Sequence, residues 1–177
     1  MRLRPLVFAA SLACLALSAK PARADASSWL FVGGGAGWID GFEADPKGAL
    51  RLQLGMGSSP NGAVVIGGTA HSLSYFGAGT DLGLSLRVAT GGFVRGGWGL
   101  ALDAGGYQRW WGVGSTGALA SLSLGAPWGI QATFDFQTGT NDQRTYAAFV
   151  GVDLLRLTVY RTTGTSWFPN PLPAVRE

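Results

Sequence analysis

Apolar and polar side chains alternate with a period of two residues along several segments of this chain. The pattern is clearest at 49–56, 81–88, 98–104 and 130–137, where one set of alternate positions carries mostly Leu, Ile, Val, Phe, Trp, Met or Ala. The other set carries mostly Gly, Ser, Thr, Gln, Asp or Arg. Successive side chains of a β-strand point to opposite faces, so each segment predicts a strand with one apolar and one polar face.

Eight such segments predict an all-β fold, an eight-stranded antiparallel up-and-down transmembrane β-barrel. The expected strands are 29–39, 49–58, 63–74, 81–89, 93–106, 117–126, 129–137 and 145–161. Strands of about 9–11 residues suit a tilted membrane crossing. In the last strand the apolar parity changes between Leu154 and Leu155, which predicts either a bulge or a turn into a ninth strand. The even strand number of bacterial barrels favours the bulge. No segment after residue 24 shows a helical pattern.

Residues 1–24 have the features of a secretory signal peptide. Arg2 and Arg4 precede an apolar stretch at 6–17, and Ala22-Arg23-Ala24 supplies the small residues of a cleavage site. The apolar stretch is shorter than the roughly 20 residues that a transmembrane helix needs. We therefore expect cleavage after residue 24, a barrel domain over 25–162 and a proline-containing tail over 163–177.

Loss of the leader changes the charge of the chain. Four of the 13 basic residues and none of the 10 acidic ones lie in it, which leaves nine basic and ten acidic residues in the mature chain. Nucleic acid is therefore not an expected partner. The one cysteine, Cys14, also leaves, so no disulfide or cysteine metal site is expected. The glycine-rich run 33–37 lacks the Lys of a phosphate-binding loop, and no cofactor is expected.

The expected connections alternate in length. The longer ones are 40–48, 75–80, 107–116 and 138–144, and the shorter ones are 59–62, 90–92 and 127–128. Outer-membrane barrels have short periplasmic turns and longer extracellular loops. The alternation therefore predicts that the longer loops lie outside the cell.

Alternation alone leaves open which face of the barrel is apolar. A soluble periplasmic barrel of the lipocalin type would enclose an apolar ligand, whereas a membrane barrel presents its apolar face to lipid. Aromatic residues gather toward the strand ends, and the middle of the apolar face is mostly leucine. Charged residues make up 13% of the chain, against about 25% in soluble proteins. These features favour a monomer in the outer membrane, in contact with its lipid.

Four charged residues interrupt the polar face, namely Arg51, Arg87, Asp103 and Asp135. In a membrane barrel they must point into the lumen, because Arg on the lipid side at mid-depth costs about 2–4 kcal/mol. The lumen of eight strands is just wide enough to be filled by side chains. We expect the two arginines and two aspartates to pair there and to fill the lumen, so that no pore forms.

With its leader, eight strands, alternating faces and unequal loops, the chain resembles the small eight-stranded outer-membrane barrels of the OmpA-like and OmpX-like class over residues 29–161. The resemblance rests on architecture and not on a sequence motif. It implies a non-enzymatic protein of the Gram-negative outer membrane. Its role would be structural, or an interaction at the cell surface through the longer loops.

His71 is the only histidine. It shares the polar parity with Asp81, and a hairpin register that pairs the two predicts a polar cluster at the lumen mouth. Some eight-stranded outer-membrane barrels hydrolyse lipids, so a lipid hydrolase using His71 is the alternative function. Barrel deacylases carry a His-x-Ser pair, and Leu73 occupies that Ser position here. We therefore assign no catalytic residue.

The expected loop at 107–116 contains Arg109, Trp110 and Trp111. Arg and aromatic residues are enriched in binding hot spots, so this loop is a candidate site for an unidentified surface ligand. Aromatic residues at this position also anchor a barrel at the membrane interface. The anchoring role is the favoured interpretation, and no metal site is assigned.

Overall fold

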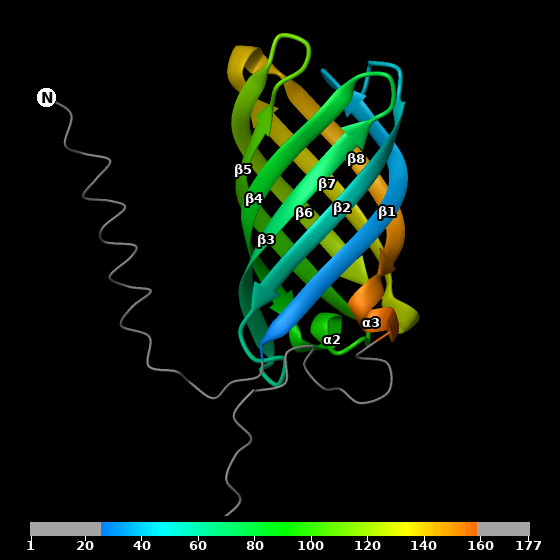
Figure 1. The fold of residues 1–177 in the computed structure, drawn as a ribbon, viewed down its shortest axis with the longest axis vertical. Helices are drawn as coiled ribbons and strands as arrows, with labels where there is room; N and C mark the ends of the chain where they lie inside the picture. Colours follow the sequence, from blue (N-terminus) through cyan, green and yellow to red (C-terminus); the bar gives the residue numbers. More distant parts are fainter. Residues whose placement is uncertain (1–25, 159–177) are drawn as a thin grey trace, which may run out of the picture.

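The computed structural model describes residues 26–158, which form a closed β-barrel (Figure 1). Each strand pairs antiparallel with its neighbours in chain order, and β1 pairs with β8 to close the sheet. The strands are β1 Ser27–Ile39, β2 Lys47–Gly57, β3 Val64–Tyr75, β4 Gly79–Thr90, β5 Gly99–Arg109, β6 Ser115–Gly125, β7 Ile130–Gly139 and β8 Arg144–Asp153. The predicted eight-stranded up-and-down barrel is confirmed. The expected signal peptide and the tail at 163–177 lie outside the described residues.

The alternation in sequence becomes an alternation between lumen and outer surface. In β4, Asp81 and Arg87 are buried, whereas Leu84 and Leu86 are each 71% exposed. The same pattern runs along β2, β5, β6 and β7. The pleat of the strand produces this separation, because neighbouring residues must face opposite sides of a closed sheet. The apolar face of the barrel is therefore its outside.

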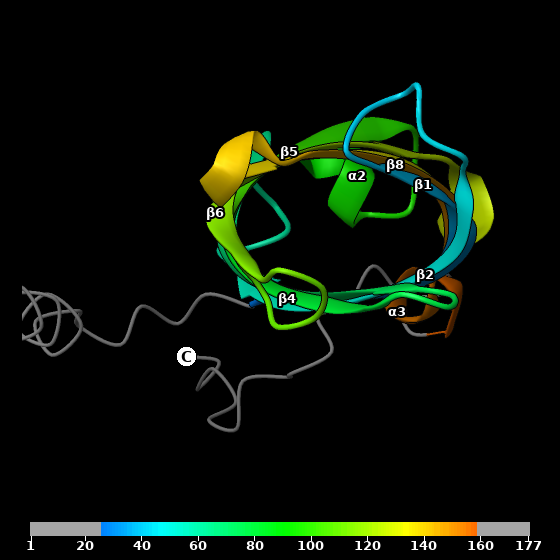
Figure 2. The ribbon, with the colours of Figure 1, turned by 90° about the horizontal axis from the view of Figure 1, so that it is seen from above.

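Two short helices at one end of the barrel were not predicted from the sequence. Helix α2, Gly91–Val94, lies inside the outline of the ring of strands in the view of Figure 2. Helix α3, Leu154–Thr158, follows β8 at the same end (Figure 1). We call this the helical end, and the opposite one the loop end. No helix within residues 26–158 is long and apolar enough to cross a membrane.

Both helices begin at a side chain that caps their free backbone N–H groups. The hydroxyl of Thr90 accepts a hydrogen bond from the backbone N–H of Phe93 at 3.3 Å. The carboxylate of Asp153 accepts from Leu155 and Arg156, at 3.0 and 3.2 Å. Such caps are local helix-start signals that a search for long periodic segments overlooks.

The expected fifth and last strands had wrong boundaries for this reason. The fifth strand begins at Gly99 instead of residue 93, because 91–94 form α2. The last strand ends at Asp153, so the parity change between Leu154 and Leu155 is neither a bulge nor a ninth strand. It marks the change from a two-residue to a helical period.

The predicted difference in loop length between the two ends is also wrong within the described residues. At the loop end seven of the eight strands extend past their expected limits, and the connections shrink to 40–46, 76–78, 110–114 and 140–143. At the helical end the connections are 58–63, 91–98 and 126–129, the second containing α2 and the third the 3₁₀ turn Pro127–Gly129. Another 3₁₀ turn, Thr140–Asp142, lies at the loop end. The strands continue because ladder hydrogen bonds satisfy backbone groups even where the side chains are small or polar.

Phe93 belongs to a buried apolar cluster that fills the lumen at the helical end, and removal of its ring should destabilise the barrel. The ring is fully buried among Trp29, Val65 and Val94. Phe93→Ala should lower the free energy of unfolding by about 3–5 kcal/mol, because it leaves a cavity in a packed layer. Denaturant unfolding of the refolded protein, followed by tryptophan fluorescence, measures the change. Phe76→Ala, at an exposed position, is the control, and equal stability of the two variants would contradict the anchoring role.

Candidate functional site

The four charged residues singled out in the sequence meet in the middle of the lumen. Arg87 holds Asp103 through two hydrogen bonds, from Nε to Oδ1 and from Nη2 to Oδ2, both 2.7 Å long. Arg51 donates to Asp135, and its Nη2 lies 3.9 Å from Asp103 Oδ2. Gln53 Nε2 adds a bond of 3.1 Å to Asp103. All five side chains are buried. The expected pairing within the lumen is therefore what the structure has.

A third ion pair lies nearer the loop end. Arg109 donates to both carboxylate oxygens of Asp81, at 2.9 and 2.7 Å. The indole Nε1 of Trp111 donates to Asp81 at 3.0 Å. The Arg109 guanidinium also lies 4.4 Å from the Trp111 ring centroid, with Tyr75 and Tyr107 at 5.9 and 5.8 Å. Aromatic faces attract a cation, so this cluster closes the lumen below the loops.

The three residues of the expected loop site, Arg109, Trp110 and Trp111, do not lie together on the surface. Arg109 belongs to β5 and is buried, and Trp111 is only partly exposed above it. Only Trp110 of the three projects outward, with 66% of its surface exposed. The two-residue parity of β5, continued past residue 106, would have placed Tyr107 and Arg109 in the lumen, and the early strand limit concealed this.

His71 and Asp81 do not form the expected cluster. The hairpin turn occupies only 76–78, so that His71 pairs with Gly83 and Asp81 pairs with Leu73. This register shift of two residues keeps both side chains in the lumen but leaves Asp81 opposite Arg109 in β5. Neither ring nitrogen of His71 has a hydrogen-bond partner among the described residues. The ring lies against Gly83, where a side chain would collide with it.

The helical end combines apolar packing with cations. Arg87 lies 5.2 Å from the Trp29 ring centroid and 5.4 Å from that of Phe93. Arg156 of α3 lies 5.1 Å from the Phe93 ring centroid and donates to the carbonyls of Gly97 and Ala126, at 2.9 and 3.0 Å. Burial lowers the pKa of Arg156, and the nearby Asp153 carboxylate acts in the opposite direction. Arg156 therefore ties α3 to two connections of the helical end.

The outer surface consists of an aliphatic belt between two groups of aromatic residues. The belt contains Leu50, Leu52, Leu54, Leu82, Leu84, Leu86, Leu100, Leu102, Leu122 and Leu124, all exposed. Trp98 and Trp128 are exposed at the helical end, and Phe76 and Trp110 at the loop end. Also at the loop end, Phe42 stacks on Tyr146 with ring centroids 4.0 Å apart.

The described part of the chain holds no group of metal ligands, and His71 and Ser74 lie on opposite faces of β3. No three or more His, Cys, Asp and Glu side chains between residues 26 and 158 are grouped to hold a metal ion. His71 faces the lumen, while the nearby Ser74 faces outward and shares a hydrogen bond with Thr80. A hydroxyl and an imidazole on opposite faces of one strand cannot act together on one substrate.

Comparison with known proteins found no match: no protein-family model fits the chain, and no curated protein resembles its sequence.

Removal of the Asp81 carboxylate should leave Arg109 buried without its counter-charge. Asp81→Asn should therefore lower the free energy of unfolding by about 3–5 kcal/mol. The double variant Asp81→Leu with Arg109→Met replaces the pair with apolar groups and should recover most of that loss. Urea unfolding of the refolded variants tests both values. Wild-type stability of the single variant would show that the pair does not hold the lumen together.

Proposed function

We propose that the protein is a non-enzymatic β-barrel of the Gram-negative outer membrane, a monomer with a structural role and a side-chain-filled lumen. One observation carries the proposal: the leucine-rich face of the closed sheet points outward, while the arginines and aspartates pair inside. A hydrocarbon solvent requires this arrangement, because it can satisfy neither a charge nor a backbone hydrogen-bonding group.

The outer surface supports the proposal through its size and its aromatic borders. Soluble monomers rarely expose a continuous apolar patch of more than a few hundred Å². Here large apolar side chains are exposed on seven of the eight strands, β2 to β8. Trp98 and Trp110 lie at opposite ends of β5. At about 3.3 Å per residue and a tilt of about 40°, they are about 30 Å apart along the barrel axis. An apolar band of about 25 Å between aromatic girdles is typical of outer-membrane barrels.

The lumen argues against a soluble barrel that carries an apolar ligand. Such a barrel needs an apolar interior with free volume. Here the middle of the interior contains Arg51, Arg87, Asp103 and Asp135, and both ends are filled by aromatic side chains. Nothing in this arrangement favours lipid hydrolysis either, since Asp81 is bound to Arg109 and no carboxylate among the described residues accepts a hydrogen bond from His71.

An interaction at the cell surface is a second candidate role, with one observation in its favour. The connection 110–114 exposes Trp110 by 66% and Val113 by 77% at the loop end. Exposed aromatic and aliphatic side chains beyond an interface are able to contact a partner. Trp110 also suits anchoring in the headgroup region, so the structural role needs no partner.

An arginine in the middle of the belt tests the membrane location. Leu84→Arg should block assembly in the outer membrane, because the charge costs about 2–4 kcal/mol at mid-depth in lipid. Thr80→Arg is the matched control: it makes the same change on the outer face of β4 but at the loop end, where charge is tolerated. The measurement is membrane fractionation, detergent extraction and comparison of boiled with unboiled samples on a gel.

The wild type and Thr80→Arg should appear in the outer-membrane fraction as a compact species that unfolds on boiling. Leu84→Arg should be degraded or found outside that fraction. A folded, water-soluble Leu84→Arg barrel, or a wild type recovered from the soluble fraction, would refute the proposal.

A further inference from the structure

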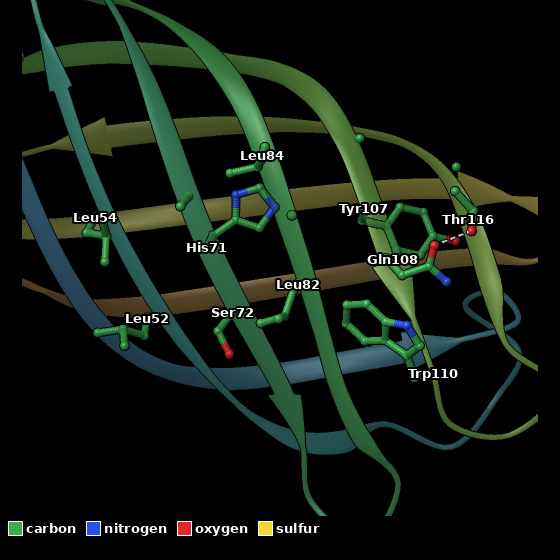
Figure 3. A pocket seen from close by; sticks show the side chains of 14 residues that line it. Leu52, Leu54, His71, Ser72, Leu82, Leu84, Tyr107, Gln108, Trp110 and Thr116 are labelled. Carbon is green, nitrogen blue, oxygen red and sulfur yellow. Dashed lines mark hydrogen bonds between the residues drawn. The ribbon is translucent and has the colours of Figure 1, made fainter. Parts of the chain in front are cut away.

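The belt is hollowed on one side by an apolar groove of about 690 Å³ (Figure 3). Exposed leucines of β2 and β4 border it, namely Leu52, Leu54, Leu82 and Leu84. Between and beside these leucines the outward residues are small: Ala70 and Ser72 in β3, and Gly106 in β5. The groove exists because tall side chains on two strands flank short ones on the strands beside them.

At its floor the groove reaches the backbone of the strands that form the barrel wall. His71, Gly83 and Tyr107 also line it, and their positions in the strands direct the two side chains into the lumen. The groove thus meets the strand backbone at these three residues. Ladder hydrogen bonds already occupy backbone groups here, so the floor offers an occupant little but van der Waals contact.

Apart from Ser72 on the floor, the polar side chains that face the groove lie at its loop end. Gln108 and Thr116, hydrogen-bonded to each other, lie beside Trp110 at the loop end. This end is level with the aromatic border of the belt, and the leucine-lined end reaches toward mid-barrel. The groove therefore has the polarity of an amphiphile that points its polar head toward the loop end.

We propose that this groove holds one acyl chain of a membrane lipid from the leaflet at the loop end. The inference rests on the proposed membrane location and goes beyond it, since it assigns a bound lipid to one place on the belt. The volume falls within the roughly 300–1,000 Å³ of ligand pockets, and the lining is mostly apolar, with Gln108 and Thr116 at the headgroup level.

The shape of the groove favours a lipid chain over a second barrel. Protein surfaces associate in lipid through close packing, because no hydrophobic force drives them together there. Leu82 and Leu84 project beside the floor and would keep a broad, convex partner away from Gly106. A single hydrocarbon chain is narrow enough to lie between the leucines and reach the floor.

Filling the floor provides the test. Gly106→Leu places a side chain in the groove, and the added Cβ would meet only the carbonyl of Gly117, at an ordinary 3.4 Å. Gly68→Leu is the matched control: it adds the same side chain to the outer face of β3, away from the groove, with Ser85 O 4.0 Å from the added Cβ. Ser72→Leu fills the floor from β3, should Gly106→Leu fail to fold.

Each full-length mature barrel is inserted into vesicles of phosphatidylethanolamine and phosphatidylglycerol, extracted in mild detergent and examined by native mass spectrometry. The wild type and Gly68→Leu should retain one phospholipid, and both floor variants should retain it about tenfold less. A tenfold loss corresponds to about 1.4 kcal/mol, which is the sum of roughly ten lost van der Waals contacts between carbon atoms.

Equal retention by all four proteins, with normal insertion, would overturn the groove assignment and leave the proposed function intact. A wild type of twice the barrel mass that becomes single in the floor variants would also overturn it, in favour of a second copy. Failure of the wild type to insert into vesicles would overturn the membrane proposal, and the groove assignment with it.

Discussion

Ion pairing inside the barrel is the interaction on which the rest of the structure depends. Arg51, Arg87 and Arg109 each hold a buried carboxylate, and the partners come from different strands. An unpaired charge in this space would cost several kcal/mol. The Arg51–Asp135 pair joins the non-adjacent strands β2 and β7, so it forms only when the sheet closes. Closure also removes the sheet edges. With the charges inside the closed sheet, the leucines face the outer surface.

The side chains inside the lumen form successive layers along the barrel axis, and neighbouring layers contact each other. At the helical end Phe93 and Trp29 form an apolar plug on which Arg87 rests, with Arg87 in turn holding Asp103. At the loop end aromatic rings surround Arg109. Cation–aromatic contact therefore joins the polar middle to its apolar borders. Because both ends and the middle are packed, functional chemistry is better sought on the outer surface than inside.

The sequence allowed much of the fold to be predicted and less of the site. Period-two alternation was enough for the strands, since it reflects the pleat of each strand alone. It also placed Arg51, Arg87, Asp103 and Asp135 on the polar face. The two helices were missed because each is shorter than two turns and is marked only by a cap. The pairing of Asp81 was wrong because register depends on the turn, and the shorter turn shifted the register by two residues.

The sequence by itself determined which side chains share a face, how many strands there are and that charge is confined to the polar parity. These are properties of single strands. Only the tertiary structure decided that the apolar parity faces outward and that Gly106 lies in a groove. It also decided that Arg109 binds Asp81, while no carboxylate among the described residues accepts a hydrogen bond from His71. Those outcomes depend on curvature, closure and register, which arise when strands distant in sequence meet and compete for partners.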